Sequence, residues 1–340
     1  MRMRKHPAPV HDSAWFVARH ACPVCGSEDS DILFSGPYAR GPVRGFVESH
    51  YRHQGQVDWR YLEGTDFVLS ACLGCDSLYQ KHVPNAFLLD NVYNVMIAQE
   101  GLIKVAMGYL TVDSFEAVAG ELATLFRLTG KPPGEIRFLD YGLGYGRWGR
   151  VAAAMGARVF ATEISPEKIA FARALGIEIV TESELRRMRF TLIHTEQVFE
   201  HLTEPGATFA VLAQTLEPEG IFKVAIPPAG GIRGSLAARG MIDASPLEYR
   251  WHSDAGTRRA AKHTDYISVI PLEHLNVFSA KAMRMLADRN GVTLISTARR
   301  AAVPVSFLNG QAAARSLLQA AKVMLRPVFR RDSGYYLFRR

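Results

Sequence analysis

The sequence predicts an α/β protein, with a mostly parallel sheet covered by helices on both faces and a small cysteine-bearing domain in front of it. Three observations lead to this prediction. Strand-like and helix-like patterns alternate from about residue 135 onward. The first of these strands runs into a glycine-rich loop, and all four cysteines fall in two C-x-x-C pairs nearer the N-terminus. A chain of 340 residues, 48% of them hydrophobic, can form two domains, or one domain with insertions.

The N-terminal segment is basic but lacks an apolar stretch, so it does not resemble a secretion signal and the protein is expected to be cytoplasmic. No run of 18 apolar residues occurs, so no membrane span is predicted. The net charge of +7 resides at the two ends, since residues 299–340 contain nine Lys or Arg and one acid. Such ends are either solvated or attract phosphate-bearing substrates, nucleic acid or anionic lipid.

The four cysteines form the ligand set of a tetrahedral, structural zinc ion, in which each tight turn supplies two thiolates. A redox dithiol would need only one pair, and disulfides are disfavoured in a reducing compartment. The predicted zinc ligands are Cys22, Cys25, Cys72 and Cys75.

A long insertion is expected between the two cysteine pairs, because 47 positions separate Cys25 from Cys72. Its segment 50–64 is rich in aromatic residues and histidine. Packing as an ordinary hairpin is favoured there over a substrate surface or a stacking site for single-stranded nucleic acid.

These features predict how the chain is divided. The parts are a basic extension, a zinc-ribbon-like domain, a helical linker and the α/β domain, at residues 1–20, 21–85, 86–134 and 135–340. Within the linker, apolar residues at helical spacing predict a helix over 112–128.

Within the α/β domain, two connections, 227–270 and 301–332, are too long to be simple. Long inserts after strand ends are typical of lids and substrate loops. The predicted strands are 136–141, 159–163, 177–181, 191–194, 221–226, 292–296 and 335–338.

The glycine-rich loop, FLDYGLGYGRWG at 138–149, allows a nucleotide ligand to approach bare backbone. Its last three glycines fit the dinucleotide pattern G-x-G-x-x-G. An acid beside a pyrophosphate would be repelled, whereas an acid beside a cationic amino-acid group would be attracted. The loop therefore favours S-adenosylmethionine over NAD, with the pattern D-x-G-x-G-x-G formed by Asp140, Gly142, Gly144 and Gly146.

Glu163 stands at the tip of the next predicted strand, 23 residues after Asp140. A carboxylate in that position can accept hydrogen bonds from both ribose hydroxyls of an adenosine. Acids at strand ends are also common without a ligand. Ser165 and Pro166 then predict a helix start, with Ser165 as its N-cap.

Three segments in this order, 138–149, 161–176 and 190–227, resemble the ordered motifs of class I S-adenosylmethionine-dependent methyltransferases. The third, FTLIHTEQVFEHLTEPGATFAVLAQTLEPEGIFKVAIP, is the most specific. Together with CPVCG and CLGC, the chain also resembles zinc-knuckle methyltransferases that act on nucleotide-linked sugars and related metabolites. The resemblance implies a Rossmann-like, doubly wound sheet of seven strands.

The resemblance also implies roles for individual residues. Glu163 matches the ribose-binding acid and Ile164 the apolar wall beside adenine, and Glu182 with Ser183 loosely matches an adenine contact. The loop that receives the methionine part corresponds to Asp140, Gly142, Gly144 and Gly146. The segment beneath the sulfonium corresponds to Thr195, Glu196 and Gln197.

Two histidines are candidates for removing a proton from the methyl acceptor. His274, preceded by Glu273, resembles the base of sugar C-methyltransferases, and His201 resembles a second active-site histidine of the same enzymes. In a structural interpretation, His201 packs against the helix that begins near Pro205. Those enzymes carry a Tyr where this chain has Pro271, and a large extra C-terminal domain that this sequence lacks, so O- or N-methylation is at least as well supported as C-methylation.

The expected function is in-line methyl transfer to an O, N or C nucleophile of a small molecule, a sugar or a nucleotide-linked or secondary metabolite. One alternative is an RNA-modifying enzyme, favoured by the zinc ribbon and basic ends, although HTEQ replaces the turn typical of base amine methylation. The other is a zinc-ribbon binding module on an inactive scaffold, against which the intact acids and glycines argue.

The two inserts suggest partners. Residues 311–331 carry an apolar stripe that would pack on the sheet or on a second subunit, as in a homodimer, rather than on a membrane. The 227–270 insert is predicted to be either a solvated loop or a lid that recognises a phosphate or carboxylate of the acceptor. Its polar and aromatic candidates are Arg233, Arg239, Tyr249, Arg250, Trp251, His252, Arg258, Arg259 and His263.

Overall fold

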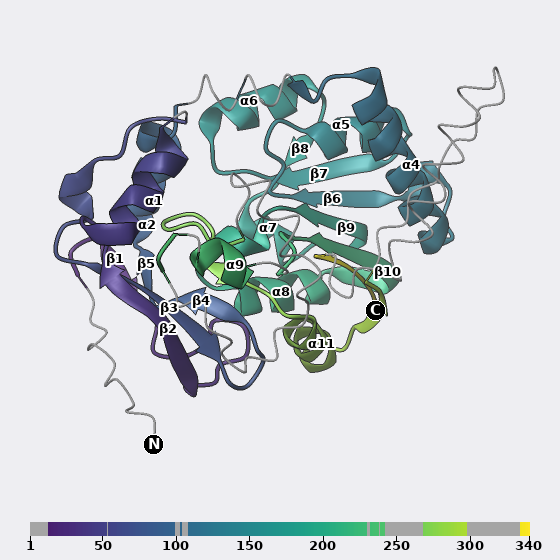
Figure 1. Ribbon diagram of the computed structural model, residues 1–340. Helices are drawn as coiled ribbons and strands as arrows, with labels where there is room; N and C mark the ends of the chain where they lie inside the picture. Colours follow the sequence, from purple (N-terminus) through teal and green to yellow (C-terminus); the bar gives the residue numbers. More distant parts are fainter. Residues whose placement is uncertain are drawn as a thin grey trace, which may run out of the picture. The chain divides into compact units, whose positions relative to one another are not determined.

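The structure is a computed structural model (Figure 1). It describes residues 13–52, 54–98, 103, 108–229, 232–237, 239–241, 268–297 and 334–340. The chain forms two compact units, each assembled from separate stretches of sequence. The first unit comprises 1–102, 199–206 and 229–285, and the second comprises 103–198, 207–228 and 286–340.

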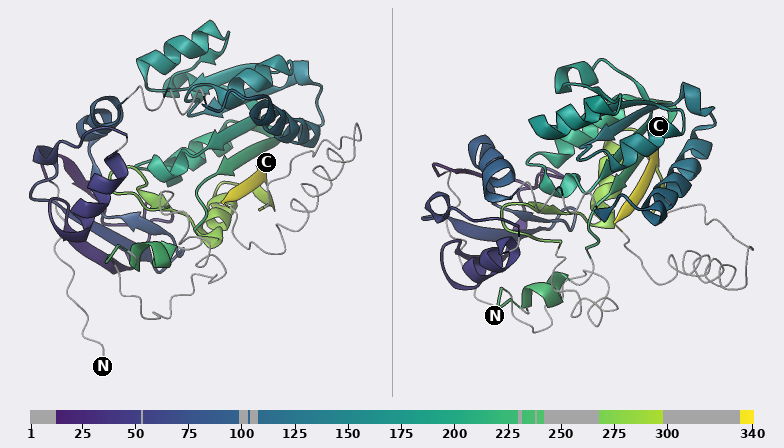
Figure 2. Two further views of the ribbon diagram at one scale, coloured as in Figure 1. Left: turned by 45° about the horizontal axis from the view of Figure 1, so that its top comes forward. Right: turned by 90° about the horizontal axis from the view of Figure 1, so that it is seen from above.

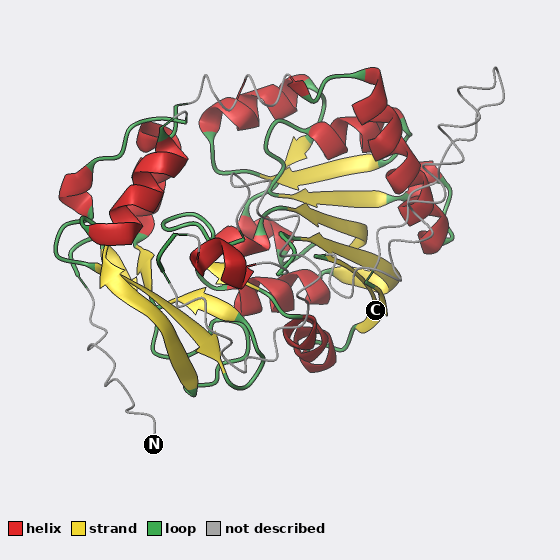
Figure 3. Ribbon diagram, in the orientation of Figure 1, coloured by secondary structure: helices red, strands yellow, loops and turns green. Residues whose placement is uncertain are grey.

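The second unit is built on a seven-stranded sheet, so the predicted central sheet is confirmed (Figure 3). The order is β12-β13-β10-β9-β6-β7-β8, and the pairs are parallel except for those of β13, which runs antiparallel to β10 and β12. The seven predicted strands all occur, with ends shifted by a few residues. They are β6 Arg137–Tyr141, β7 Arg158–Thr162, β8 Glu178–Ile179, β9 Phe190–Glu196, β10 Leu216–Ala225, β12 Thr293–Ser296 and β13 Tyr335–Arg339.

Helices cover both faces of this sheet (Figure 2). Neighbouring residues of β10 point to opposite faces: the ring of Phe222 lies 5.1 Å from that of Phe209 in α8, whereas Nζ of Lys223 lies 4.5 Å from the ring of Trp148 in α5. The double winding is thus confirmed. The helices are α4 Val112–Thr129, α5 Arg147–Ala154, α6 Pro166–Ala174, α7 Glu182–Leu185, α8 Pro205–Gln214 and α11 Ala280–Arg289, with the short 3-10 helix η3 Pro133–Glu135 before β6.

The predicted helix over 112–128 is confirmed as α4. The side chain of Thr111 accepts a hydrogen bond from the Ser114 amide at its start, and Gly130 adopts a left-handed conformation with φ 68° at its end. Its buried face, with Val118, Leu122 and Leu125, joins the core formed by β6, β7, β9 and α5. The burial of this face holds α4 against the sheet.

The first unit contains a four-stranded antiparallel sheet in the order β11-β4-β3-β2. A second, two-stranded sheet pairs β1 with β5. The strands are β1 Phe16–Ala18, β2 Ser30–Pro37, β3 Asp66–Cys72, β4 Leu78–Gln80, β5 His82–Pro84 and β11 Asn276–Val277. The helical elements are α1 Gly41–Tyr51, α2 Ala86–Asn91 and α9 Ile232–Ala237, the 3-10 turns η1 Trp59–Tyr61 and η4 Phe199–His201, and the π-helix η2 Val92–Met96.

The hairpin prediction for 50–64 is wrong. The long insertion between the cysteine pairs contains β2, the helix α1 and the turn η1. The buried residues of α1 explain the helix, because Val43, Phe46, Val47 and Tyr51 recur at helical spacing and line one face. They pack in the core of the first unit with residues of α9 and β11.

Only part of the two inserts falls within the described residues. Arg239 stacks its guanidinium 4.7 Å from the ring of Phe46 in the first unit. The side chain of Arg233, the candidates between Tyr249 and His263, and the predicted apolar stripe at 311–331 lie outside the described residues. In the part of the chain that is described, no helix is both long and apolar enough to cross a membrane.

Candidate functional site

The glycine-rich loop joins β6 to α5 in the second unit. Gly142, Gly144 and Gly146 have φ values of 80°, 57° and 69°, a conformation that side-chain-bearing residues rarely adopt. A Cβ on Gly142 would lie 2.6 Å from Cγ2 of Val198, whereas a Cβ on Gly144 would meet no atom within 4 Å. The two glycines therefore have different roles, because Gly142 permits close packing and Gly144 faces open space.

Glu163 follows β7 and faces the same loop. Its Oε2 accepts a hydrogen bond of 2.9 Å from the Gly144 amide, and its Oε1 accepts bonds of 2.8 and 3.0 Å from the amides of Ile164 and Ser165. Ser165 is the N-cap residue of α6 as predicted, but its side chain makes no capping hydrogen bond. Ile164 is 81% exposed, so a large apolar side chain stands uncovered beside the loop.

Asp140 is buried at the end of β6. Its Oδ2 accepts a 2.9 Å hydrogen bond from the Gly149 amide, and its Oδ1 lies 2.9 Å from Nδ1 of His194. Burial raises the pKa of the carboxyl to about 7. Both oxygens thus bind groups of the protein, and the predicted contact between Asp140 and a cationic ligand stays a prediction.

The third candidate segment lies at the end of β9. Thr195 is fully buried, Glu196 forms an ion pair with Lys223 of β10, and the Gln197 amide donates a 2.8 Å hydrogen bond to the Ala225 carbonyl. Gln197 has a φ of 56°, a strained value for a residue with a side chain, and such strain is found most often at functional sites.

These candidates gather at one place in the sheet. The strands β6, β7 and β8 proceed toward one edge, and β9 and β10 lie on the other side of β6. The order therefore reverses between β6 and β9, and ligands of open α/β sheets bind beyond the carboxyl ends of the strands at such a point. The loop, Glu163 and the 195–197 segment all follow those carboxyl ends. Glu182 and Ser183 begin α7 after β8, where Glu182 pairs with Arg186 at 3.0 Å.

The first unit brings together the three predicted catalytic residues. The rings of His201 and His274 lie 4.8 Å apart at 85°. Glu273 binds Nε2 of His50 through Oε1 at 3.0 Å, and Nδ1 of His201 lies 2.8 Å from the hydroxyl of Tyr93. Burial lowers the pKa of His201 to about 4, so its imidazole is neutral near pH 7.

His201, His274 and Glu273, together with four residues that sequence reasoning missed, are here called the histidine cluster. The four missed residues are His50 and Tyr51 of α1, Tyr93 of η2 and Glu200 of η4. Glu200 is 1% exposed, and its Oε1 lies 3.8 Å from Nε2 of His201. Burial and the nearby Glu273 carboxylate raise the pKa values of Tyr51 and Tyr93. No local pattern links these positions, which come from separate segments.

The turn that carries His201 is fixed by a buried arginine. Arg19 donates to the carbonyls of Leu202 at 3.2 Å and Thr203 at 2.6 Å, and to Oδ1 of Asn276 at 2.8 Å. Asn276 in turn donates to carbonyls of the same turn, at Phe199, Glu200 and Leu202. His201 is therefore held by contacts within the first unit, which supports a site role as well as a packing role.

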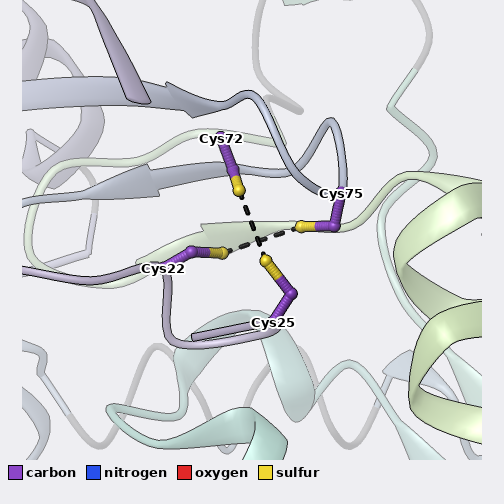
Figure 4. Close-up of side chains that lie close together, drawn as sticks. All are labelled: Cys22, Cys25, Cys72 and Cys75. Carbon is purple, nitrogen blue, oxygen red and sulfur yellow. Dashed lines mark hydrogen bonds between the residues drawn. The ribbon is translucent and has the colours of Figure 1, made fainter. Parts of the chain in front are cut away.

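The four cysteines converge in the first unit, as Figure 4 shows. The sulfur of Cys22 lies 3.7 Å from that of Cys75, and the sulfur of Cys25 lies 3.4 Å from that of Cys72. Disulfide sulfurs are about 2.05 Å apart, whereas a tetrahedral zinc with bonds of about 2.3 Å separates its sulfurs by about 3.8 Å. All four are buried, and their sulfurs lie within 4.8 Å of one another. The donor set and spacing fit a zinc ion.

The two cysteine turns share one geometry. The Gly26 amide donates to the Cys22 carbonyl at 2.8 Å, and the Asp76 amide donates to the Cys72 carbonyl at 3.1 Å. Gly26 and Asp76 have φ values of 74° and 60°. In the second turn the residue with positive φ is Asp76, directly after the second cysteine, and Asp tolerates this conformation.

The seven-stranded sheet, the loop at its reversal point and the acid after the second strand define a class of protein, the nucleotide-cofactor enzymes with a Rossmann-like fold. The family model described as "Methyltransferase domain" matches residues 114–297, more than half of the chain. The protein belongs to this methyltransferase family. It is a methyltransferase, and the resemblance inferred from its motifs is confirmed at that level.

Three solved structures illustrate what the chain is similar to. An S-adenosylmethionine-dependent methyltransferase from Mesorhizobium loti is 18% identical over 65% of this chain and 98% of its own, with a TM-score of 0.37. The plantazolicin methyltransferase BpumL in complex with SAH is 15% identical over 74% and 92%, with a TM-score of 0.44. PKMT2 from Rickettsia typhi in complex with AdoHcy is 13% identical over 66% and 53%, with a TM-score of 0.42. A comparison with curated protein sequences found no match.

Proposed function

We propose that the second unit binds S-adenosylmethionine beyond the carboxyl ends of β6, β7 and β9. Gly142, Gly144 and Gly146, with Asp140 behind them, would receive the methionine part. Three features of Glu163 and its neighbour support the adenosine end: a carboxylate that faces the loop, amide bonds that hold it there, and an exposed Ile164 that adenine would cover. Thr195, Glu196 and Gln197 would lie beneath the sulfonium.

We further propose that the histidine cluster serves the methyl acceptor. When bound, the cofactor supplies a methyl group already activated on a sulfonium, so the protein must position a nucleophile, exclude water and accept a proton. His274 is the proposed base, with Glu273 and His201 beside it. The observation that carries this proposal is the edge-to-face contact of His274 with His201, whose ring is held by Tyr93, because it places a second imidazole beside the proposed base.

The proposed acceptor is a small molecule, a sugar or a nucleotide-linked or secondary metabolite with a nucleophilic O, N or C atom. A compact cluster of proton-transfer groups suits a hydroxyl or amine acceptor, which must lose a proton on methylation.

The cysteines are proposed to hold a structural zinc ion, since four protein thiolates leave no open position for a substrate. The residues assigned are Cys22, Cys25, Cys72 and Cys75. The zinc would hold together the turns before β2 and between β3 and β4.

Binding of S-adenosylhomocysteine, measured by calorimetry, tests the donor site. We expect the wild type to bind and Glu163→Gln to bind at least tenfold more weakly, because the side-chain amide has one acceptor oxygen instead of two and carries no charge. The matched control is Glu178→Gln, which alters an exposed acid on β8. Absence of binding by the wild type would refute the donor site.

Transfer of a labelled methyl group to a panel of nucleotide sugars, small metabolites and RNA tests the acceptor class. We expect transfer to a small molecule, abolished or reduced at least a hundredfold in His274→Ala. Transfer to RNA alone would refute the acceptor class. Full activity of His274→Ala would remove His274 as the base.

A further inference from the structure

Four ionisable side chains form a continuous hydrogen-bonded chain inside the second unit, here called the buried relay. They lie on three neighbouring strands: Asp140 on β6, His194 and Glu196 on β9, and Lys223 on β10. Nδ1 of His194 lies 2.9 Å from Oδ1 of Asp140, its Nε2 lies 2.9 Å from Nζ of Lys223, and Lys223 also donates to Oε2 of Glu196. The side chains of His194 and Lys223 are fully buried.

The chemistry of the lysine fixes the direction of the hydrogen bonds. An ammonium group can only donate, so Nε2 of His194 must accept from Lys223. The ring proton therefore resides on Nδ1 and is donated to Asp140. The ammonium lies between the carboxylates of Glu196 and Glu121, the latter at 3.7 Å, and over the ring of Trp148. The two carboxylates and the ring of Trp148 offset the free-energy cost of removing this charge from water.

One end of the buried relay closes the glycine-rich loop. The second oxygen of Asp140 accepts the Gly149 amide, and this bond ties the end of β6 to the first turns of α5. A Cβ on Gly149 would lie 3.3 Å from that oxygen and 2.9 Å from Cδ1 of Leu143. The loop between these two points contains three glycines with positive φ, and the tie joins the two ends of this loop.

The other end of the buried relay reaches the segment after β9. Lys223 holds Glu196, which precedes the strained residue Gln197. His194 also packs against Trp148, with ring centroids 4.4 Å apart, so α5 contacts the relay along its length. One imidazole thus connects the cofactor loop to the segment proposed to lie beneath the sulfonium.

We propose that His194 is a positioning residue for the cofactor. By donating from Nδ1 it orients the Asp140 carboxylate toward Gly149 and so holds the cofactor loop. Its Nε2 only accepts from the ammonium of Lys223, which Glu196 and Glu121 also hold. This inference rests on the proposed donor site. Its consequence is that cofactor affinity depends on a side chain that does not touch the cofactor.

Two substitutions distinguish the hydrogen bond from His194 to Asp140 from the hydrogen bond that His194 accepts from Lys223. In His194→Asn, the side-chain amide can occupy the place of Nδ1–H and still donate to Asp140. In His194→Gln, the longer side chain can place its oxygen near Nε2 and accept from Lys223, but the donor to Asp140 is lost. We expect the glutamine variant to bind S-adenosylhomocysteine about tenfold or more weakly than the wild type, and the asparagine variant to bind within about threefold of it.

A matched control is His82→Asn in the first unit, whose ring also makes a short bond, 2.7 Å from Nδ1 to the Asp66 carbonyl. It should leave the affinity unchanged. Equal weakening in both His194 variants, or no weakening in either, would overturn the proposal. If the wild type itself does not bind, the proposed donor site fails first, so the two failures are distinguishable.

A spectroscopic measurement tests the proposal without relying on a variant that folds. The imidazole nitrogen shifts of the ¹⁵N-histidine-labelled wild type, with His194 assigned by its absence from His194→Asn or His194→Gln spectra, should show a neutral ring protonated on Nδ1. A ring protonated on Nε2 would reverse the hydrogen bonds and refute the inference. If neither variant folds, the wild-type spectrum still tests the inference. A spectrum without any neutral histidine ring protonated on Nδ1 would contradict the protonation state assigned to His194.

Discussion

The hydroxyl of Tyr93 lies 2.8 Å from Nδ1 of His201, although 108 positions separate the two residues. Tyr93 belongs to the π-helix η2 and His201 to the turn η4, so two irregular elements supply the pair. Irregular helical turns of this kind are frequent at functional sites. The contact fixes the ring of His201 and leaves Nε2 on the side of Glu200.

Removal of this hydroxyl should lower the rate of methyl transfer. In Tyr93→Phe, the ring of His201 loses the group that orients it beside the proposed base His274, and we expect kcat to fall about tenfold to a hundredfold. Affinity for S-adenosylhomocysteine should be unchanged, because Tyr93 belongs to the first unit. Initial-rate kinetics and calorimetry measure the two quantities. A loss of cofactor affinity with unchanged kcat would contradict the assignment.

The ionisation of His201 gives a second prediction. Its pKa is about 4 in the folded protein and about 6.5 when exposed, so the unfolded chain binds the proton first as pH falls. The contribution of His201 to stability is therefore present above pH 6.5 and is lost as pH falls toward 4. Since 26% of the side chain is exposed, we expect at most about 3 kcal/mol.

The measurement is the free energy of unfolding between pH 4 and 7 for the wild type and for His201→Gln. The difference between the two curves should decrease steadily as pH falls. A constant difference over this range would show that His201 titrates at its ordinary pKa in the folded state.

The sequence predicted the sheet because its signals are local. Each strand between residues 136 and 338 is marked by its own composition, and the spacing of Asp140, the glycines and Glu163 sets out one loop and the strand beside it. The bond from the Gly144 amide to Glu163 joins residues only 19 positions apart. Interactions of this range follow from one βαβ unit, so they can be derived without the rest of the fold.

The histidine cluster and the buried relay could not be derived in that way. His50 meets Glu273 across 223 positions, and no periodicity relates α1 to the segment before β11. Lys223 did carry a signal, since a lysine within the apolar strand IFKVAI must be buried or paired. Its partners on β9 become visible only when the register of β10 against β9 is known, with Lys223 opposite His194.

The glycines of the cofactor loop should respond differently to alanine. In Gly142→Ala, the new Cβ would meet Val198 at 2.6 Å in addition to the positive φ, and we expect a loss of about 2–4 kcal/mol in the free energy of unfolding. In Gly144→Ala, only the φ of 57° is unfavourable, at about 1–2 kcal/mol. Urea unfolding measures both.

The effect of these variants on cofactor binding should not follow their effect on stability. The space above Gly144 is open, and the proposed cofactor would enter it, so Gly144→Ala should weaken binding of S-adenosylhomocysteine more than its small effect on stability suggests. If Gly144→Ala binds as tightly as the wild type, the cofactor does not approach this part of the loop.

Loss of one cysteine should remove the metal and destabilise the first unit. We expect one zinc per chain in the wild type and almost none in Cys72→Ser, because three thiolates at neutral pH hold zinc far more weakly than four. The matched control is Asp76→Gly. Asp76 has a φ of 60° and its side chain makes an exposed 3.6 Å contact with Lys281, so glycine should keep the zinc and leave stability equal or slightly higher.

Loss of the zinc in Cys72→Ser should also destabilise the turn that carries His201. The Gly206 amide donates a 3.1 Å hydrogen bond to the carbonyl of Pro23, which lies between the first two cysteines, and a Cβ on Gly206 would lie 2.8 Å from that oxygen. Metal analysis and thermal unfolding of wild type, Cys72→Ser and Asp76→Gly check the prediction. Full zinc content and an unchanged melting temperature in Cys72→Ser would show that the four sulfurs, though 3.4 to 3.7 Å apart in pairs, do not hold a structural metal.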